Sequence, residues 1–298
     1  PTLYVLDTIS PDDSAIRQWY MFQQGDEYQD DVLYWLRENW RISRESHIDA
    51  SNKPLGAKWN VALHHLGDWH KQPGFMIAPS GGDLITALNW IDEPDNVLGF
   101  LLAPIVTLGH PHIIASSSMK SNFLMVPQSD GTALRIDFWY IDNKARVFLP
   151  IMPTIYPDEQ LPSLVAYPWH ILDERRLTVE TRQLEDDDLF VSVTIWNADA
   201  KTPLETCFLI ARTGAARMLI LITSANYPYT SPQARLTPSI HIQPEDDMYE
   251  VFANAWAQSE AISYQPEWTP ESTLLDYVHA LEEHLGFAKS AASSEETP

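Results

Sequence analysis

Met218 to Ile242, MLILITSANYPYTSPQARLTPSIHI, is the stretch that decides the expected fold of this chain. It begins with an apolar run typical of a buried strand, continues through a proline-rich turn and ends in a second strand-like run. Each proline holds φ at about -65° and has no N–H for a sheet ladder, so the chain must leave the sheet and return at a defined point. The turn from Tyr227 to Pro232 is therefore expected to join two neighbouring antiparallel strands.

A similar stretch stands earlier, from Val147 to Ile171, with the sequence VFLPIMPTIYPDEQLPSLVAYPWHI. When the two are aligned, several residue types recur at an almost constant offset of about 70 residues, as two copies of one supersecondary unit would produce. The matched pairs are Phe138 with Phe208, Tyr156 with Tyr227, Pro157 with Pro228, and Pro162 with Pro232. The sequence therefore predicts an internal repeat of two tandem modules.

The composition indicates an acidic globular protein with room for two domains. The chain has 298 residues and 45% hydrophobic content, which supplies a core for each of two domains of ordinary size. Its 19 Lys and Arg residues against 41 Asp and Glu residues give a formal net charge of -22. This charge repels a phosphate backbone and an anionic membrane, so neither nucleic acid nor a membrane is expected as a partner. The acidic excess serves solubility or presents an acidic face to a basic partner protein.

Cysteine usage and the lack of a long apolar run predict a cytoplasmic location. The single cysteine, Cys207, excludes an intramolecular disulfide and a cysteine-based zinc site. No apolar run reaches about eighteen residues, as a membrane-spanning helix requires. The opening residues PTLYVLDTISPDDS lack the basic flank and apolar core of a signal peptide.

Residues 1–82 are interpreted as a helical and loop-rich N-terminal segment. From Asp30 to Ile42, DDVLYWLRENWRI, apolar residues recur at helical spacing behind two acids, which is typical of an amphipathic helix. Its expected buried face consists of Val32, Trp35, Leu36 and Trp40. Glycines and prolines then interrupt residues 52–82 repeatedly, so a long loop or an insertion is expected there.

Residues 83–172 are predicted to form the first module. A short helix is expected from Asp83 to Glu93, with Asp83 capping its first turn and Pro94 ending it. Strand-like runs follow, with a hairpin turn at Asp142 and Asn143 between the last two. The expected strands are Val97–Ile105, Ile113–Ser117, Phe123–Val126, Ala133–Ile141 and Ala145–Met152.

Residues 173–287 are predicted to form the second module, an antiparallel meander with flanking helices, so the fold class is α+β. Its opening segment, Asp173 to Leu184, fits a helix or an extended chain, and periodicity leaves both open. Three strands and then a fourth one after the Tyr227 turn are expected. The first three are Phe190–Trp196, Glu205–Ala211 and Ala216–Thr223.

Two helices are expected to complete the second module. The first extends from Asp246 to Ala257, where apolar residues have helical spacing. The second should have Thr269 as its N-cap, Pro270 at its first position and Gly286 at its end. Residues 288–298 contain no apolar residue larger than alanine and should form a disordered tail.

The order of elements in the second module resembles the ubiquitin-conjugating (UBC) fold. In that family an antiparallel meander, a Tyr-Pro turn after its third strand, a fourth strand and a Trp-x-Pro step into a late helix follow one another. The corresponding residues here are Tyr227, Pro228 and Pro232 in the turn and Trp268, Thr269 and Pro270 in the step. The resemblance covers residues 173–287, and it reaches residues 83–172 only through the meander and the earlier Tyr-Pro turn.

Catalytic members of that family carry a cysteine after the fourth strand, and its thiol forms the thioester with the ubiquitin-like protein. The corresponding stretch here, PSIHIQPEDD from Pro238 to Asp247, contains no cysteine. Cys207 lies upstream in the second strand, where a buried apolar role is expected. The resemblance therefore implies a non-catalytic relative of the UEV or RWD type, which acts as a binding scaffold in a multi-protein complex or a ubiquitin-like pathway.

The expected site is accordingly a surface for a protein partner, either basic or ubiquitin-like, with no cofactor and no catalytic residue. Its candidate residues are His241, Tyr249 and Trp256. His241 and the acids that follow it make no recognisable catalytic mechanism, because neither a nucleophile nor a metal accompanies them.

Two other functions stay open. The first is a metal-dependent hydrolase, with a transition-metal site assembled from two histidine clusters and Asp68, although neither cluster has the spacing of a strong zinc motif. The clusters are His64, His65 and His70 in HHLGDWH, and His110 and His112 in HPH. The second is a sugar- or peptide-binding module, because the chain has 11 tryptophans whose indole faces can stack on a ligand. Most of these tryptophans fall in apolar patterns, which favours core packing.

Overall fold

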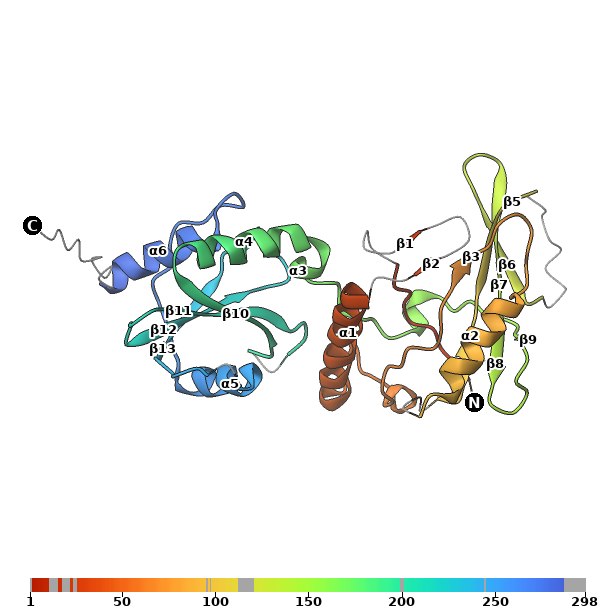
Figure 1. The fold of residues 1–298 in the computed structure, drawn as a ribbon, viewed down its shortest axis with the longest axis horizontal. Helices are drawn as coiled ribbons and strands as arrows, with labels where there is room; N and C mark the ends of the chain where they lie inside the picture. The colour runs from red at the N-terminus through yellow and green to blue at the C-terminus, as the bar shows by residue number, and fades with distance from the viewer. Residues whose placement is uncertain are drawn as a thin grey trace, which may run out of the picture. The chain divides into compact units, whose positions relative to one another are not determined.

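The computed structural model describes residues 2–10, 16–17, 22–23, 26–94, 96, 98–111, 121–198, 201–243 and 245–286. The chain divides into two compact units: Pro1–Asp7 with His64–Leu161, and Thr8–Leu63 with Pro162–Pro298. Both units combine helices with mainly antiparallel sheets, so the fold class is α+β (Figure 1). The division differs from the expected ranges, since residues 64–82 group with the first unit, and residues 8–63 and 162–172 group with the second.

The described part of the first unit contains short strands, one α-helix and a 3-10 helix at Asp158–Gln160. The strands are β3 (His70–Lys71), β4 (Phe100–Leu102), β5 (Ile105–Pro111), β6 (Phe123–Pro127), β7 (Thr132–Asp137), β8 (Trp139–Asp142) and β9 (Leu149–Pro150). One sheet has the order β3-β5-β7-β6, in which the β3 and β5 pair is parallel, and the other has the order β4-β8-β9. The strand expected at Ile113–Ser117 lies outside the described residues.

The helix of the first unit, α2 (Gly81–Asp92), begins at a capping box. The hydroxyl of Ser80 accepts a hydrogen bond from the Asp83 backbone N–H at 3.2 Å, and the Asp83 carboxylate accepts one from the Ser80 N–H at 2.5 Å. This exchange satisfies two amides that the first turn would otherwise leave free. Ala87 and Ile91 then pack against β4 and β8. The expected helix is confirmed, and it begins slightly earlier than Asp83.

The residues matched in the expected repeat do not occupy equivalent positions. Phe208 is fully buried within a strand, whereas Phe138 lies between β7 and β8. Tyr227 is 2% exposed, whereas Tyr156 is 37% exposed. Tyr156 lies outside the sheets, with Pro157 as the N-cap of a 3-10 helix at Asp158–Gln160, and Pro162 also lies outside any strand. The order β3-β5-β7-β6 furthermore differs from the consecutive order of a meander.

The second unit contains a consecutive antiparallel meander, as the sequence predicts. Its helices are α1 (Asp26–Ser46), α3 (Trp169–Leu172), α4 (Glu174–Asp186), α5 (Met248–Gln258) and α6 (Leu274–Leu285), and a 3-10 helix lies at Ala57–Trp59. Its strands are β1 (Ile16–Arg17), β2 (Phe22–Gln23), β10 (Leu189–Trp196), β11 (Glu205–Arg212), β12 (Arg217–Thr223), β13 (Gln233–Pro238) and β14 (Glu260–Ala261). The main sheet has the order β10-β11-β12-β13-β14. The segment after Asp173, which periodicity left open, is the helix α4.

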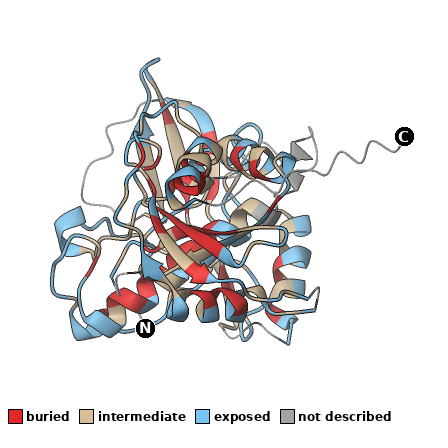
Figure 2. Cartoon of the chain, turned by 90° about the vertical axis from the view of Figure 1, so that its left-hand side faces the viewer, coloured by how far each residue is buried: buried red, intermediate tan, exposed pale blue. Residues whose placement is uncertain are grey.

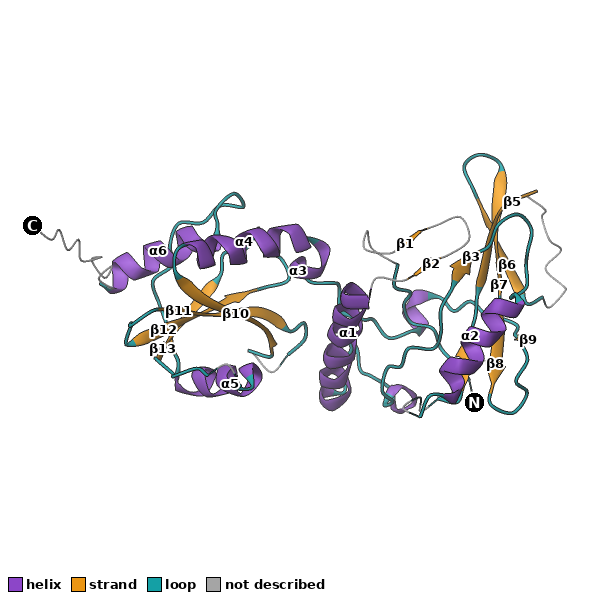
Figure 3. Cartoon of the chain, viewed as in Figure 1, coloured by secondary structure: helices purple, strands orange, loops and turns teal. Residues whose placement is uncertain are grey.

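The meander lies between two layers of helices (Figure 3). Helices α4 and α6 cover one face, where Phe208 and Leu221 meet Leu184 and Leu281 in one core. Helix α5 covers the other face, where its Phe252 belongs to a second core. Strands β11 and β12 are therefore buried on both sides, which explains their continuous apolar runs, and Figure 2 shows the buried residues in this sheet and on the helix faces that meet it.

The closing helix begins later than predicted. Thr273, not Thr269, is the N-cap of α6, and it forms a capping box with Asp276. Thr269 instead belongs to a separate turn, in which its backbone N–H donates to the Ser272 hydroxyl at 3.0 Å. The prediction of Thr269 as N-cap and of Pro270 as first helical residue is therefore wrong, because the reciprocal threonine and aspartate pair three residues apart outweighs the preference of proline for a first turn. Gly286 ends the helix in the left-handed conformation, as predicted.

The capping box of α6 allows a first prediction. Replacing Thr273 with alanine removes the side-chain acceptor for the Asp276 N–H and should lower the free energy of unfolding by about 1 kcal/mol. Urea unfolding followed by far-UV circular dichroism measures this loss. Thr269→Ala is the matched control, and an equal loss in both variants would contradict the assignment of the cap.

Helix α1 packs its predicted apolar face into a third core of the second unit. Val32, Trp35 and Leu36 are buried there with Ile171 of α3 and with Leu204, which precedes β11. The indole N–H of Trp35 donates to the Ala166 carbonyl at 3.1 Å, so even the buried polar atom of this face has a partner. In the part of the chain that the structure describes, no helix is both long and apolar enough to cross a lipid bilayer.

Candidate functional site

The Tyr227 turn is anchored by a buried carboxylate on α4. The Tyr227 hydroxyl donates a hydrogen bond of 2.5 Å to Glu180, and the backbone N–H of Leu274, the first residue of α6, donates one of 2.7 Å to the same carboxylate. Arg176 adds an ion pair at 3.1 Å. Burial, followed by the Glu180 carboxylate, raises the pKa of the Tyr227 hydroxyl above its usual range. Glu180 therefore joins the turn, α4 and the start of α6, and it has a structural role that the sequence reading missed.

The other residues that carry the resemblance in and after this turn also have structural roles. The indole N–H of Trp268 donates to the Pro228 carbonyl at 2.7 Å, and the hydroxyl of Tyr277 donates to the Pro232 carbonyl at 2.7 Å. These bonds secure both prolines from the side of α6 and the segment before it. Pro270 is exposed outside the helix, and its carbonyl accepts a hydrogen bond of 3.1 Å from Arg176.

Cys207 is buried inside the second unit. Its side chain is fully buried in β11, within the core beneath α5. Burial, with a smaller effect from Glu205, raises the pKa of the Cys207 thiol well above its usual range. A thiol in this state lacks the thiolate character and the access that a nucleophile needs, so the buried apolar role predicted for Cys207 is confirmed.

The residues predicted for the partner surface have different degrees of access. Tyr249, on the first turn of α5, is 53% exposed, and His241 is exposed in the segment before α5. Trp256 is only partly exposed, because the guanidinium of Arg235 lies 4.5 Å above its ring and Phe252 stacks beside it. Trp256 thus supports the surface, while Tyr249 and His241 can reach a partner.

A second exposed tyrosine, Tyr34 on α1, lies within electrostatic range of Tyr249. Tyr34 is 47% exposed, and partial burial raises the pKa of its hydroxyl, with further increases from the nearby Glu38 and Tyr249. Under Tyr249, the ring of Trp196 lies 5.3 Å away and packs in turn on Phe252 at 5.1 Å. We name Tyr34 and Tyr249 the tyrosine surface. The sequence reading missed Tyr34, because residues this far apart in the chain give no local signal of their proximity.

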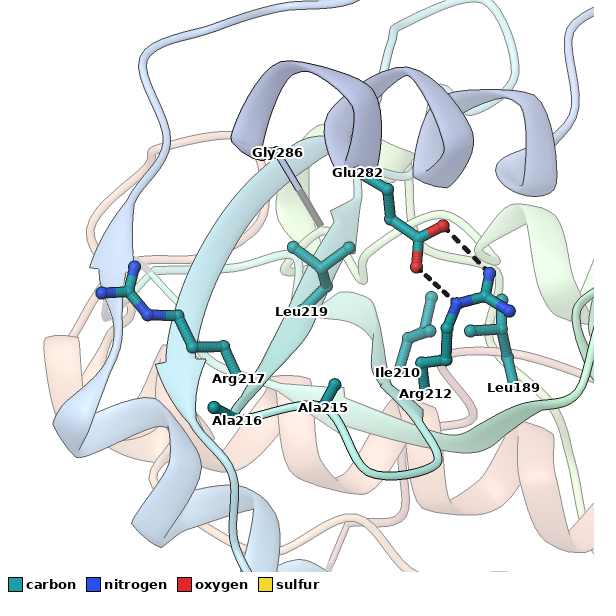
Figure 4. A pocket seen from close by; sticks show the side chains of 9 residues that line it. All are labelled: Leu189, Ile210, Arg212, Ala215, Ala216, Arg217, Leu219, Glu282 and Gly286. Atoms are coloured by element: carbon teal, nitrogen blue, oxygen red, sulfur yellow. Dashed lines mark hydrogen bonds and ion pairs between the residues drawn. The ribbon is translucent and has the colours of Figure 1, made fainter. Parts of the chain in front are cut away.

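A pocket of about 300 Å³ opens at one end of the sheet, beside the last turn of α6 (Figure 4). Its apolar lining comes from three neighbouring strands: Leu189 of β10, Ile210 of β11 and Leu219 of β12. The other lining residues are Arg212, Ala215, Ala216, Arg217, Glu282 and Gly286. This volume is at the lower end of the range for small-molecule sites and suits one apolar side chain of a partner.

The charged rim of this pocket is already paired on one side. Arg212 donates two hydrogen bonds of 2.9 Å to the carboxylate of Glu282 and one of 2.8 Å to Asp187. The bond to Glu282, followed by the bond to Asp187, raises the pKa of Arg212 above its usual range. In Figure 4 the Arg212 side chain turns toward Glu282, whereas Arg217 points away from this pair. At the rim of the pocket, Arg212 is therefore already paired with carboxylates, whereas Arg217 points away from that pair.

Among the described histidines of the two clusters, one is exposed and three make ordinary polar contacts. His64 is exposed, His65 lies 3.0 Å from Asp68, and His70 lies 3.1 Å from the Gln72 amide and 3.7 Å from Asp83. His110 lies 2.7 Å from the Thr107 hydroxyl, and His112 is outside the described residues. Among the residues that the structure describes, no group of three or more His, Cys, Asp or Glu side chains could hold a metal ion.

Comparisons of this chain with protein-family models, with curated proteins and with solved structures found no match. The fold class rests on the architecture itself, which combines six helices with several antiparallel sheets in the described residues.

Proposed function

We propose that this protein is a non-catalytic protein-binding scaffold, whose second unit resembles the inactive UEV and RWD relatives of the UBC fold. It would act as a subunit of a multi-protein complex or in a ubiquitin-like pathway. The observation that carries the proposal is the tyrosine surface, in which two exposed tyrosines from helices distant in sequence lie within electrostatic range of each other and an aromatic layer packs beneath Tyr249.

Tyrosine is well suited to such a surface. Its ring buries a large apolar area, its hydroxyl bonds to a partner, and it loses little side-chain entropy because it has only two rotatable bonds, so it is enriched among residues that dominate binding energy. Trp196 and Phe252 pack beneath Tyr249. This support limits its motion before binding and reduces the entropy lost on association.

The order of elements supports the resemblance to inactive UBC-fold proteins. The meander is followed by the Tyr-Pro turn, by the Trp268 contact to Pro228 and by the closing helix α6. The segment after β13 contains no cysteine, and the thiol of Cys207 is buried elsewhere. These features favour a binding role over thioester chemistry.

Loss of the tyrosine surface should weaken partner binding strongly. The full chain, used as bait in an extract of its native host, should recover a stoichiometric protein partner. The Tyr34→Ala and Tyr249→Ala variants should each bind that partner about 30-fold more weakly, which corresponds to about 2 kcal/mol for a well-supported aromatic contact. Isothermal titration calorimetry with the purified partner measures the change.

Tyr229→Ala is the matched control, because Tyr229 is an exposed tyrosine in the Tyr227 turn and lies outside the tyrosine surface. Its affinity for the partner should equal that of the unmodified chain. The proposal fails if no stoichiometric partner is recovered, or if the three tyrosine variants bind the partner alike.

A further inference from the structure

The two edges of the main sheet in the second unit differ in how far they are paired with other segments. At one edge, the two-residue strand β14 and the Ile262 N–H, which donates to the Ala234 carbonyl at 2.9 Å, pair with residues 234–236 of β13 and cover that part of the edge. At the other edge, β10 has eight residues and pairs only with β11 (Figure 3). Within the described chain, no backbone hydrogen bond joins β10 to any other segment. Among the described residues, the backbone donors and acceptors on one side of β10 therefore have no backbone partner.

Strand β10 also lacks three features by which proteins protect an edge. Its sequence, LFVSVTIW, contains no charged residue and no proline, and nothing in its pairing with β11 indicates a bulge. Phe190 and Val193 are 41% and 39% exposed, and they point to opposite faces of the sheet because they are three positions apart. Ile195 packs into the core of α1, so the open part extends from Phe190 to Thr194. Such an edge is a template for the addition of another strand.

The acidic charge at the start of β10 indicates which side chains the added strand should carry. Four consecutive acids, Glu185 to Asp188, lead directly into the strand, and Arg212 and His279 engage only Asp187 among them. Asp186 remains 73% exposed, with a single distant contact of 3.9 Å to the equally exposed Arg182. Opposite charge attracts an incoming segment and fixes its register. Two copies of this chain, each with a net charge of -22, repel one another.

We propose that β10 binds an extended segment of a basic partner protein as an added strand. Backbone hydrogen bonds along Phe190–Thr194 provide the attachment, apolar side chains of the segment contact Phe190 on one face and Val193 on the other, and lysine or arginine at one end meets the acids Glu185–Asp188. This inference rests on the proposed binding function and names the chemistry of one partner segment.

The test uses the full chain and fluorescein-labelled peptides of about a dozen residues. One peptide alternates valine and threonine and ends in lysines, a second ends in glutamates, and a third is the lysine peptide with alternate backbone nitrogens methylated. Fluorescence anisotropy should show binding of the lysine peptide, and at least tenfold weaker binding of the other two. Phe190→Lys and Val193→Lys should each weaken it at least tenfold, and Asp186→Lys should reduce the preference for the lysine peptide over the glutamate peptide.

Three results would overturn the inference. These are no binding of the lysine peptide, equal binding of the methylated peptide, and a concentration-dependent dimer in sedimentation that Val193→Lys abolishes, since the last would mean that a second copy occupies β10. Circular dichroism must show folded variants, and Val179→Lys, at an exposed valine on α4, is the matched control. The variant with both Tyr34→Ala and Tyr249→Ala should bind the lysine peptide normally, so failure at β10 and failure of the tyrosine surface are distinguishable.

Discussion

The Glu180→Ala variant should lose about 3–5 kcal/mol of unfolding free energy, the range measured when one partner of a buried charged network is removed. The Glu180 carboxylate is almost completely buried and accepts hydrogen bonds from the Tyr227 hydroxyl, the Leu274 backbone N–H and Arg176. Removing it leaves the first two donors buried without an acceptor. Arg176 loses less, because it is partly exposed and also donates to the carbonyls of Pro270 and Ser272.

Urea unfolding monitored by tryptophan fluorescence measures this loss, through the midpoint of the transition at unchanged slope. Glu185→Ala is the matched control, because it removes an exposed acid from the same helix and should change the stability by less than about 0.5 kcal/mol. Tyr227→Phe removes a single donor and should cost about 1–2 kcal/mol. A Glu180→Ala variant within about 1 kcal/mol of the unmodified chain would show that Glu180 does not hold the turn and α6 together.

Sequence periodicity was sufficient for the elements that bury one face or both. The spacing of Val32, Trp35 and Leu36 predicted the inner face of α1, and all three are buried. The apolar runs of β11 and β12 predicted adjacent strands, because a strand covered by helices on both faces has no polar alternation to obscure it. These patterns are local, so one sequence is enough to detect them.

Such local patterns could not predict contacts between segments that are distant in the sequence. The helix α4 was ambiguous because it is rich in charged residues, and the glutamate that anchors Tyr227 is one acid among several there. Its role depends on three segments that meet only in the folded unit. For the same reason the candidate site was predicted only in part: Tyr249 was expected, whereas Tyr34 comes from α1 and comes within electrostatic range of Tyr249 only after folding.

The expected repeat shows how similar letters can have different structural meanings. Tyr227 is held by Glu180 in a buried junction, but Tyr156 lies on the surface outside any strand, where its ring contacts Tyr4. Proline and tyrosine are common in exposed turns as well as in buried ones. A short Tyr-Pro motif therefore indicates this structural unit only where a helix also supplies a buried carboxylate for the tyrosine.

Acidification from pH 7 to pH 4 should lower the free energy of unfolding by about 3 kcal/mol through His170 alone. Burial lowers the pKa of His170 from 6.5 to about 4. Between these values the unfolded chain binds a proton that the folded chain excludes, so the stability is complete above about pH 6.5 and falls with decreasing pH. Each unit of difference in pKa corresponds to about 1.4 kcal/mol.

The surroundings of His170 explain why it stays neutral in the folded chain. Its Nδ1 lies 2.7 Å from the Thr206 hydroxyl, and the His170 and Trp35 rings make a T-shaped contact with their centroids 5.9 Å apart, so a charge there would lose water without gaining a carboxylate. Asp187, whose pKa is lowered by its bonds to Arg212 and then His279, loses its stabilising effect only at still lower pH, below about 4.

His170→Asn separates the effect of proton uptake from the effect of the contact with Thr206, because asparagine can keep a contact with Thr206 but does not titrate. Urea unfolding between pH 7 and pH 4 should show a steep loss of stability in the unmodified chain and a much flatter profile in the variant. His64→Asn, at an exposed histidine, should retain the steep profile. Parallel pH profiles for the unmodified chain and His170→Asn would contradict the assignment, because the proton uptake would then belong to another group.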